Sequence, residues 1–247
     1  EYAQINVHGP RSRELLASVT GTDLSNEAFP FRTARHIEVS GASVLCVRIT
    51  YVGELGYELY VPADGALEVY DQLVAAGEPF DLRRVGLNAL GSLRIEKGYR
   101  DYGHDIDNTD DPFEAGLGFA VALDKTGGFI GRDALIARSS AGPPTRRLAQ
   151  ILLTDPDPLM FHGEIVYRNG KAVGYVRAAS YGHTLGGAVG LAMVEAGEPI
   201  TKDFLATGSW HVDIAGHRHE AIASLAALYD PRGHRVHGQE RHVPGGT

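Results

Sequence analysis

A run of small residues with two adjacent prolines divides this chain into two parts. The run is Ser139-Ser140-Ala141-Gly142-Pro143-Pro144-Thr145. Because proline and glycine interrupt helices and strands, such a run is typical of a linker. The 247 residues are enough for two domains that each bury their own core. We therefore predict one domain over residues 1–140 and a second over residues 146–238.

The part after the linker is predicted to consist of β-strands. Asn169-Gly170 is a hairpin signal between two apolar runs. Several short strands separated by frequent turns favour a small barrel or sandwich. The predicted strands cover residues 147–153, 164–168, 171–177, 188–194, 210–214 and 218–224. The tail from Pro231 onward is rich in His, Arg and Gly, and we expect it to be loosely held.

The part before the linker mixes strands and helices, which predicts an α+β fold. Pro10 suits the first turn of a helix after an opening strand, and Ser40-Gly41 predicts a hairpin. Further helices are predicted over residues 65–76, 85–97 and 132–138, and strands over residues 35–39, 42–49, 59–61 and 119–123. The apolar spacing predicts Leu67, Tyr70, Leu73 and Val74 as the stripe of the helix over residues 65–76, and Leu87, Leu90 and Leu93 as the buried edge of the helix over residues 85–97.

Charge and composition argue against several classes of partner. The net charge of -8 disfavours nucleic acid and anionic membrane surfaces. No apolar run approaches the roughly 20 residues of a membrane-spanning helix. Cys46 is the only cysteine, so an internal disulfide is impossible. Its apolar surroundings in the sequence predict a buried thiol, a reducing compartment and a cytoplasmic location.

Two dense clusters of polar, aromatic and glycine residues form the candidate ligand site. They cover residues 51–60 and 93–107, at the predicted ends of a strand and a helix, where side chains point into clefts. In the first cluster, Glu54 can accept two parallel N–H bonds from a 2-amino-pyrimidinone edge or from a guanidinium. The alternative is that Glu54 only pairs with a neighbouring arginine.

The second cluster adds a cation and an aromatic ring to the candidate site. Arg94 can hold a carbonyl or carboxylate group of a ligand, or can equally form an ion pair with Glu96 or Glu58. Tyr102 can stack on a ligand or hydrogen-bond to it, whereas aromatic residues beside glycine more often serve packing. From residue type alone, both alternatives stay open.

Other candidate sites lack the spacing that their chemistry requires. Asp101, Asp105, Asp107, Asp110 and Asp111 do not follow the order of a calcium loop, so we interpret them as a solvated acidic loop. His217 and His219 have no third ligand at zinc-like spacing, and we expect no metal. The chain also lacks a nucleophile elbow and a dinucleotide-binding fingerprint, and no catalytic residue is identified.

Five motifs in a fixed order make the pattern more specific than its parts. They are Tyr51-Val52-Gly53-Glu54-Leu55-Gly56-Tyr57-Glu58-Leu59-Tyr60; Leu93-Arg94-Ile95-Glu96-Lys97-Gly98-Tyr99-Arg100 followed by Gly103-His104-Asp105; Pro112-Phe113-Glu114-Ala115-Gly116-Leu117; Phe129-Ile130-Gly131-Arg132-Asp133-Ala134-Leu135; and Arg146-Arg147-Leu148. To about Gly238, the chain resembles the aminomethyltransferase family of the glycine cleavage T-protein. The sequence of residues 54–62 and 96–100 is more similar to that of the tetrahydrofolate-binding C-terminal half of dimethylglycine and sarcosine dehydrogenases.

This resemblance implies a partial folate-binding aminomethyltransferase domain of α+β type, followed by a small C-terminal β-barrel. It implies that the carboxylate of Glu54 binds the pterin ring, that Arg94 contacts the folate, and that Tyr102 lines the same cavity. The cofactor implied is tetrahydrofolate. FAD is implied only on a separate flavin domain, expected in the same full-length polypeptide and absent from this chain.

The reaction implied is the transfer of a one-carbon unit from the iminium of a methylated amine to tetrahydrofolate, giving 5,10-methylenetetrahydrofolate. The opening residues lack a starting Met, so we expect a fragment cut within the folate domain. The family's acidic residue that helps to deprotonate the folate nitrogen would lie upstream, and neither Asp101 nor Asp105 stands in its motif. The isolated fragment is therefore not expected to be fully active. The alternatives are a free-standing glycine cleavage aminomethyltransferase with a lipoyl-protein partner and a non-catalytic folate-fold binding protein.

Overall fold

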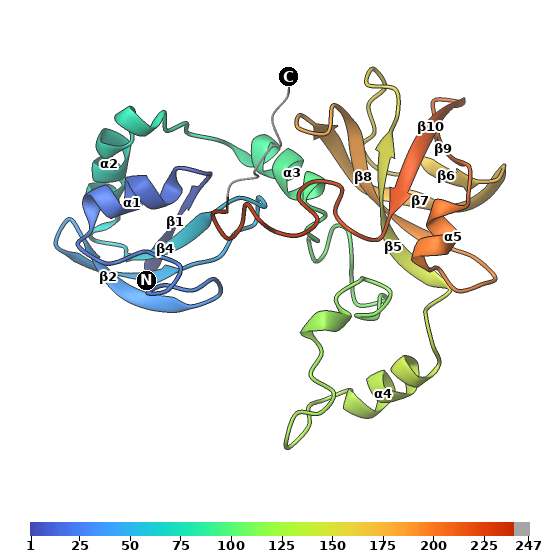
Figure 1. Cartoon of the computed structure of the whole chain (residues 1–247), viewed down its shortest axis with the longest axis horizontal. Coiled ribbons are helices and arrows are strands. Elements are labelled where there is room, and N and C mark those ends of the chain that lie inside the picture. Colours follow the sequence, from blue (N-terminus) through green and yellow to red (C-terminus); the bar gives the residue numbers. More distant parts are fainter. Residues whose placement is uncertain (240–247) are drawn as a thin grey trace. The chain divides into compact units, whose positions relative to one another are not determined.

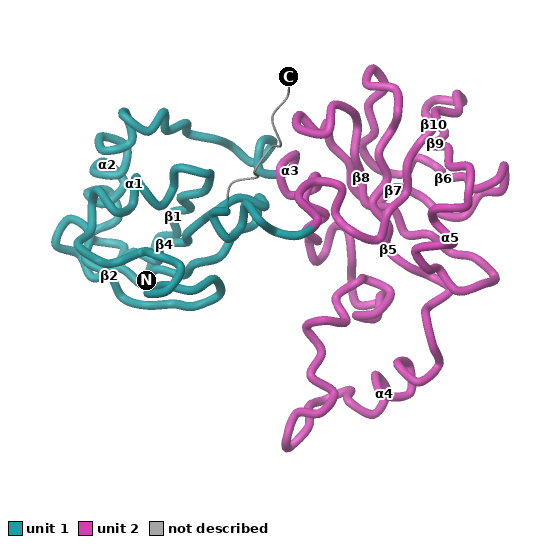
Figure 2. The backbone as a smooth tube through the Cα atoms, viewed as in Figure 1, with its two compact units in different colours: residues 1–90, 232–247 teal, residues 91–231 magenta. Residues whose placement is uncertain are grey.

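The computed structural model describes residues 1–239, which form two compact units. The first unit contains residues 1–90 together with the described part of residues 232–247, and the second contains residues 91–231 (Figure 2). The predicted domain boundary between residues 140 and 146 falls inside the second unit, and it stays a prediction. Each unit is described separately below.

The first unit is built on a four-stranded antiparallel sheet in the order β1-β4-β3-β2. The strands are β1 Tyr2–His8, β2 Ala34–Val39, β3 Ala42–Val47 and β4 Gly56–Pro62 (Figure 1). Ser40 and Gly41 have φ values of 52° and 73°, as a tight two-residue turn between twisted strands requires. The predicted hairpin is therefore confirmed. Cys46 on β3 is buried, and burial raises the pKa of its thiol to about 12.

Three helical segments accompany this sheet: α1 Ser12–Val19, α2 Ala66–Ala76 and the 3-10 helix η1 Glu78–Phe80. On α2 the buried side chains are Val69 and Leu73, four positions apart and so on one face of the helix. The stripe predicted for this helix is wrong in part, because Leu67 is 72% exposed. The helix contacts β1 and β4, and that contact selects the Val69–Leu73 face.

The second unit contains a closed six-stranded antiparallel barrel in the order β10-β5-β8-β7-β6-β9. Its strands are β5 Arg146–Leu153, β6 Ile165–Arg168, β7 Lys171–Gly182, β8 Gly187–Glu195, β9 Trp210–Ile214 and β10 His217–Ser224. The mixed α+β first part and the small β-barrel are both confirmed, as is the Asn169-Gly170 hairpin, whose φ values are 51° and 78°. Closure of the barrel leaves no free sheet edge.

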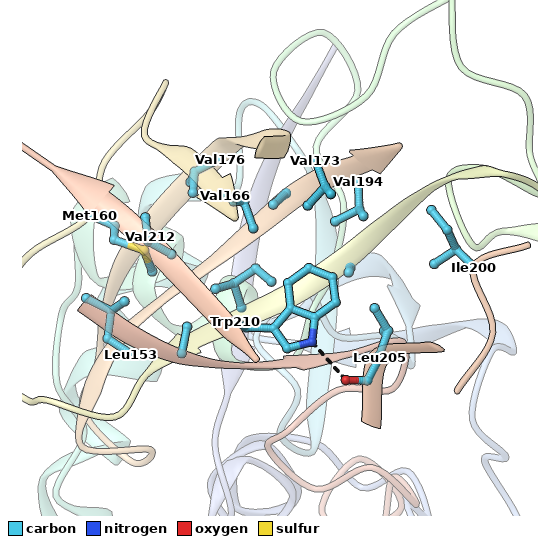
Figure 3. Packing of buried hydrophobic residues seen from close by; sticks show 14 of the residues in the cluster. Leu153, Met160, Val166, Val173, Val176, Val194, Ile200, Leu205, Trp210 and Val212 are labelled. Atoms are coloured by element: carbon cyan, nitrogen blue, oxygen red, sulfur yellow. Dashed lines mark hydrogen bonds between the residues drawn. The ribbon is translucent and has the colours of Figure 1, made fainter. Parts of the chain in front are cut away.

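Apolar side chains fill the barrel interior. Trp210 is 3% exposed and donates its indole N–H to the carbonyl of Leu205 at 2.8 Å, so its polar end is satisfied (Figure 3). Leu205 belongs to α5 Lys202–Ala206. The remaining fully buried members of this core include Ile151, Val166, Val176, Ala188, Val194, Ile200 and Val212.

The helix α3 Leu87–Glu96 buries a polar face, contrary to the apolar edge predicted for it. Leu87 is 83% exposed, whereas Ser92, Arg94 and Glu96 are buried. Ser92 donates to the carbonyl of Tyr181 at 2.6 Å, so the barrel satisfies part of this face. Apolar spacing cannot detect a helix face that is buried through hydrogen bonds.

Residues 119–123 do not form the predicted strand. The chain there forms the 3-10 helix η2 Gly118–Ala120, and the amide of Val121 donates to the carbonyl of Gly118 at 3.1 Å. The β-branched and aromatic composition of this stretch is overridden by this local turn. The predicted short helix after it is confirmed as α4 Arg132–Ser140.

The C-terminal tail packs against the first unit at Val236 and His237, so the expectation that it is loosely held is wrong at these two positions. Val236 is 4% exposed, and the ring of His237 lies edge-on to Phe31 with centroids 5.4 Å apart. Part of that expectation falls on residues 240–247, which lie outside the described residues. Among the described residues, every helix is too short or too polar to span a bilayer.

Candidate functional site

Glu54 lies in the loop that leads into β4 in the first unit. Gly53 precedes it with φ 78°, a conformation that glycine adopts without strain. Leu55 follows it, and its carbonyl accepts hydrogen bonds from the amide of Gly9 at 2.8 Å and from the hydroxyl of Ser12 at 3.0 Å. These bonds tie the loop to the start of α1. Glu54 is therefore presented from a fixed backbone.

The carboxylate of Glu54 is partly exposed and lies near a cation from the C-terminal tail. Its side chain is 15% exposed, and its Oε2 is 3.8 Å from Nη1 of Arg235. This distance is that of an ion pair rather than a hydrogen bond. Pairing with an arginine was the alternative to a ligand-binding role for Glu54. The folate-binding role of Glu54 stays a prediction. A carboxylate of this kind can accept paired N–H donors.

Arg94 of α3 is buried in the second unit, where it pairs with Asp105. Its Nη1 is 2.5 Å from Oδ2 of Asp105 and its Nη2 is 3.1 Å from Oδ1, which is the two-point geometry that guanidinium groups make with carboxylates. Nη1 also donates to the carbonyl of Tyr99 at 2.9 Å. The partner is neither of the two glutamates considered from the sequence. A folate contact by Arg94 stays a prediction.

Glu96, the glutamate that follows Arg94 on this helix, binds backbone amides of the barrel. Glu96 is 1% exposed, and its Oε1 accepts hydrogen bonds from the amides of Thr184 and Leu185 at 2.8 and 2.9 Å. These amides belong to the turn between β7 and β8. Glu96 therefore secures α3 to the barrel.

The interpretation of the aspartates in residues 101–111 as a solvated acidic loop is wrong for Asp105 and Asp110, which are buried ion-pair partners. Asp105 is fully buried, and Asp110 has a side chain that is 1% exposed. Asp110 accepts from Arg146 at 2.6 Å and from Arg177 at 2.6 and 3.3 Å. Burial alone raises the pKa of Asp110, but hydrogen bonds from Arg177, the Asp107 amide and Arg146 outweigh it, and the pKa lies below its usual value.

The segment from Tyr99 to Asp107 forms a fixed loop around Asp105. The amide of Gly103 donates to the carbonyl of Ile106 at 2.7 Å, and Arg177 donates to the carbonyl of Asp105 at 3.0 Å. Ile106 is 7% exposed and packs against Leu148, Leu191 and Met193 on the barrel. Tyr102, in contrast, is 71% exposed. The loop thus displays Tyr102 from a rigid backbone, and the folate role of Tyr102 stays a prediction.

The sequence provided no signal for the pairing of Asp105 with Arg94 or of Asp110 with Arg177. The first pair is separated by 11 positions and the second by 67. A surplus of acidic residues in a loop is compatible with solvation as well as with burial. Only the fold brings the arginines to them.

Two family models match the chain in succession. The GCVT N-terminal domain matches residues 1–125, and the glycine cleavage T-protein C-terminal barrel domain matches residues 146–230. A solved structure, the glycine cleavage system aminomethyltransferase T from Bartonella henselae, superposes with a TM-score of 0.74 over 91% of this chain and 58% of that chain. At 23% sequence identity this likeness shows the fold alone.

Two curated proteins are similar over nearly all of this chain. The 4-methylaminobutanoate oxidase (formaldehyde-forming) of Paenarthrobacter nicotinovorans is 44% identical over 236 residues, which are 96% of this chain and 28% of that protein. The mitochondrial sarcosine dehydrogenase of Homo sapiens is 38% identical over 240 residues, 96% of this chain and 26% of that protein. The chain therefore spans little more than a quarter of the length of either relative.

Proposed function

Because this chain belongs to the glycine cleavage T-protein family, we propose that it is the tetrahydrofolate-binding, one-carbon-transfer module of a flavoenzyme that oxidises N-methylated amines. The observation that carries this proposal is the similarity to an N-methyl amino acid oxidase and to sarcosine dehydrogenase over 96% of the chain. The chain is homologous to part of each of these enzymes. In this proposal the flavin is bound by another part of the full-length enzyme. That flavin-binding part is the partner of the present chain.

The chemistry of these relatives explains why a folate acceptor is useful. Oxidation of an N-methyl group produces an iminium, which water hydrolyses to formaldehyde and the free amine. Formaldehyde is named as a product of the Paenarthrobacter nicotinovorans relative. A tetrahydrofolate nitrogen that reaches the iminium first retains the carbon as 5,10-methylenetetrahydrofolate. We propose this capture as the reaction in which the chain takes part.

Of the residues predicted to bind folate, we retain Glu54 in the first unit and Tyr102 in the second as proposed direct contacts, each on the evidence of its own surroundings. The carboxylate of Glu54 suits the paired N–H donors of the pterin ring. Tyr102 offers an exposed aromatic face to a flat ligand. Because both terminal nitrogens of Arg94 already bind Asp105, we propose that Arg94 acts by holding the loop that carries Tyr102.

Titration calorimetry tests the folate site directly. The stable reduced folate 5-formyltetrahydrofolate is titrated into the 247-residue protein, with p-aminobenzoylglutamate as a control that lacks the pterin. Saturable binding of the first compound and none of the second is expected. Equal binding of both, or of neither, would contradict a pterin-recognising site.

Membership of the glycine cleavage T-protein family supports a second candidate, a transferase that works with a lipoyl-carrying protein. The two functions differ in the donor of the carbon. Formation of 5,10-methylenetetrahydrofolate from a free iminium supports the first. If 5,10-methylenetetrahydrofolate forms only when an aminomethyl-lipoyl protein is the donor, the transferase function is supported. Folate binding without transfer from either donor indicates a binding protein.

A further inference from the structure

The strand β1 Tyr2–His8 lies at an edge of the sheet in the first unit, and its outer side has no partner strand among the described residues. It pairs only with β4, in an antiparallel register that places Ile5 opposite Leu59. Just past the strand, the amide of Gly9 donates to the carbonyl of Leu55 at 2.8 Å and continues the same register. One side of β1 is therefore fully paired and the other is open.

The register identifies which backbone groups of β1 lie on the open side. Antiparallel pairing alternates between residues that bond to the partner strand and residues whose N–H and C=O point away from it. Because Gly9 bonds toward β4, Val7 and Ile5, two and four positions earlier, bond to β4 as well. The N–H and C=O groups of Gln4 and Asn6 therefore point outward. Within residues 1–239 these groups have no protein hydrogen-bond partner.

This edge lacks the features by which proteins protect a free strand from pairing. Such strands usually carry charged residues, a proline or a bulge. The strand β1 is seven residues long, its register with β4 is unbroken, and it contains no charged residue and no proline. The strand at the other edge of the same sheet, β2, carries Arg35 and Glu38. The edge of β1 is therefore open to pairing with another strand.

The side chains of β1 determine what kind of strand fits beside it. Val7 is 7% exposed, and the half-buried Ile5 packs against the core of the first unit. Gln4 and Asn6 are exposed, and their side-chain amides are hydrogen-bonded to each other at 3.1 Å. Because successive side chains of a strand point to opposite faces, an added strand needs apolar residues on the side of Ile5 and polar residues on the side of Gln4. The fitting partner is a strand that alternates between apolar and polar residues.

We propose that β1 pairs along its outer edge with such a strand from the part of the full-length enzyme that lies outside this chain. The inference rests on the proposed function in one respect, namely that this chain is one module of a longer enzyme. The chain spans 28% and 26% of the two curated enzymes and 58% of the solved aminomethyltransferase whose fold it shares. A strand from the same polypeptide has a high effective concentration, so the pairing needs no second copy. Main-chain hydrogen bonds provide the affinity in this kind of strand addition.

Amide hydrogen exchange at single-residue resolution tests the pairing, in the 247-residue protein and in the full-length enzyme. In the 247-residue protein we expect slow exchange at Ile5 and Val7, which bond to β4, and fast exchange at Gln4 and Asn6. In the full-length enzyme we expect exchange at Gln4 and Asn6 to be slower by about 100-fold or more, as for amides of a paired strand. Fast exchange at Gln4 and Asn6 in the full-length enzyme would overturn the proposal.

Slow exchange at Gln4 and Asn6 already in the 247-residue protein would overturn the proposal as well. Sedimentation then distinguishes the two possible causes: a dimer indicates pairing with a second copy, and a monomer indicates that the chain itself covers the edge. The exchange readout does not depend on folate. Folate binding with an unprotected edge contradicts the pairing alone, and a protected edge without folate binding contradicts the folate site alone.

Proline variants of the full-length enzyme provide the second readout. Proline at an outward-pointing position removes the N–H that an added strand would bind and leaves the bonds to β4 in place. Gln4→Pro is therefore expected to restore fast exchange at Asn6. His36→Pro is the matched control at the other edge of the sheet, since His36 is exposed and the register of β2 with β3 points its N–H outward. Exchange at Asn6 should stay slow in His36→Pro. If it also stays slow in Gln4→Pro, backbone pairing does not protect this edge and the proposal is wrong.

Discussion

Arg94 and Asp105 form a two-point ion pair inside the second unit, with side chains that are 6% and 0% exposed. The pair joins α3 to the loop over residues 99–107, which displays Tyr102 and His104. Moving such charges out of water costs several kcal/mol per ion, and only a close partner with further hydrogen bonds offsets that cost. The carbonyl of Tyr99 and the amide of Asp101 supply those further bonds. The Arg94–Asp105 ion pair therefore restricts the motion of this loop.

Asp105→Asn is expected to destabilise the protein by about 3–5 kcal/mol, because the buried guanidinium of Arg94 loses its counter-charge and meets an amide donor. The free energy of unfolding from urea denaturation measures this loss. Asp101→Asn, in the same loop but exposed, is the control and should change it by less than about 0.5 kcal/mol. Equal small effects of both substitutions would show that the Arg94–Asp105 pair does not hold the loop.

Glu54→Gln is expected to weaken binding of 5-formyltetrahydrofolate by about 1–3 kcal/mol, the cost of replacing one acceptor oxygen with a donor against the pterin N–H groups. Calorimetric titration measures the change. Glu58→Gln is the matched control, because Glu58 lies four positions later and accepts a hydrogen bond from the hydroxyl of Tyr60 at 2.8 Å. Folate affinity that is the same in Glu54→Gln and the wild type would remove Glu54 from the site.

Features determined by neighbouring residues were predictable from the sequence. Asn169 and Gly170 both take positive φ, and an Asn-Gly pair between two apolar runs is a strong local signal for a hairpin. The barrel strands follow from repetition of such local signals. The apolar edge predicted for α3 was wrong because the helix buries polar groups that the barrel satisfies.

Contacts between distant polar residues were not predictable. The amides that Glu96 binds are 88 and 89 positions away, and Asp110 meets an arginine 67 positions away. No periodicity links such residues, since a charged residue in a loop has the same local pattern whether it is solvated or paired. For the candidate site, the sequence indicated Glu54, Arg94 and Tyr102. The buried carboxylate that binds both Arg94 and His104 became visible only in the structure.

Tyr102→Ala is expected to weaken folate binding by about 0.5–1.5 kcal/mol, the contribution of an aromatic stacking pair, without lowering stability. The reason is that Tyr102 is 71% exposed and buries little surface in the free protein. Calorimetry and thermal denaturation of the same sample separate the two effects. Tyr2→Ala removes the ring of a β1 residue that is 67% exposed, and it should leave affinity unchanged. Weaker binding in both variants would indicate a nonspecific effect.

His8 at the end of β1 is expected to make stability depend on pH. Burial lowers its pKa from 6.5 to about 4, and its Nε2 is buried without a hydrogen-bond partner in residues 1–239. Between these two values the unfolded chain binds a proton that the folded protein does not. Stability contributed by neutral His8 is therefore complete above pH 6.5 and is lost as the pH falls toward 4.

The loss amounts to about 3 kcal/mol over this window, since one pKa unit corresponds to about 1.4 kcal/mol. Urea denaturation of the wild type and of His8→Gln between pH 6.5 and 4 measures it as a difference in slope. His36→Gln, which replaces an exposed histidine on β2, should retain the wild-type slope. Parallel pH profiles of the wild type and His8→Gln would contradict the buried, neutral state of His8.

Gly174 on β7 lies directly against the backbone of the neighbouring barrel strand β8. A Cβ atom at this position would lie 1.9 Å from the carbonyl oxygen of Met193 on β8, which is backbone and cannot rotate away. Gly174→Ala must therefore separate the strands, and we expect a loss of about 1–3 kcal/mol or more in the free energy of unfolding. Gly197→Ala is the control, because a Cβ there meets nothing within 4 Å. If both variants unfold at the same urea concentration as the wild type, the tight pairing of β7 with β8 does not limit the stability of the barrel.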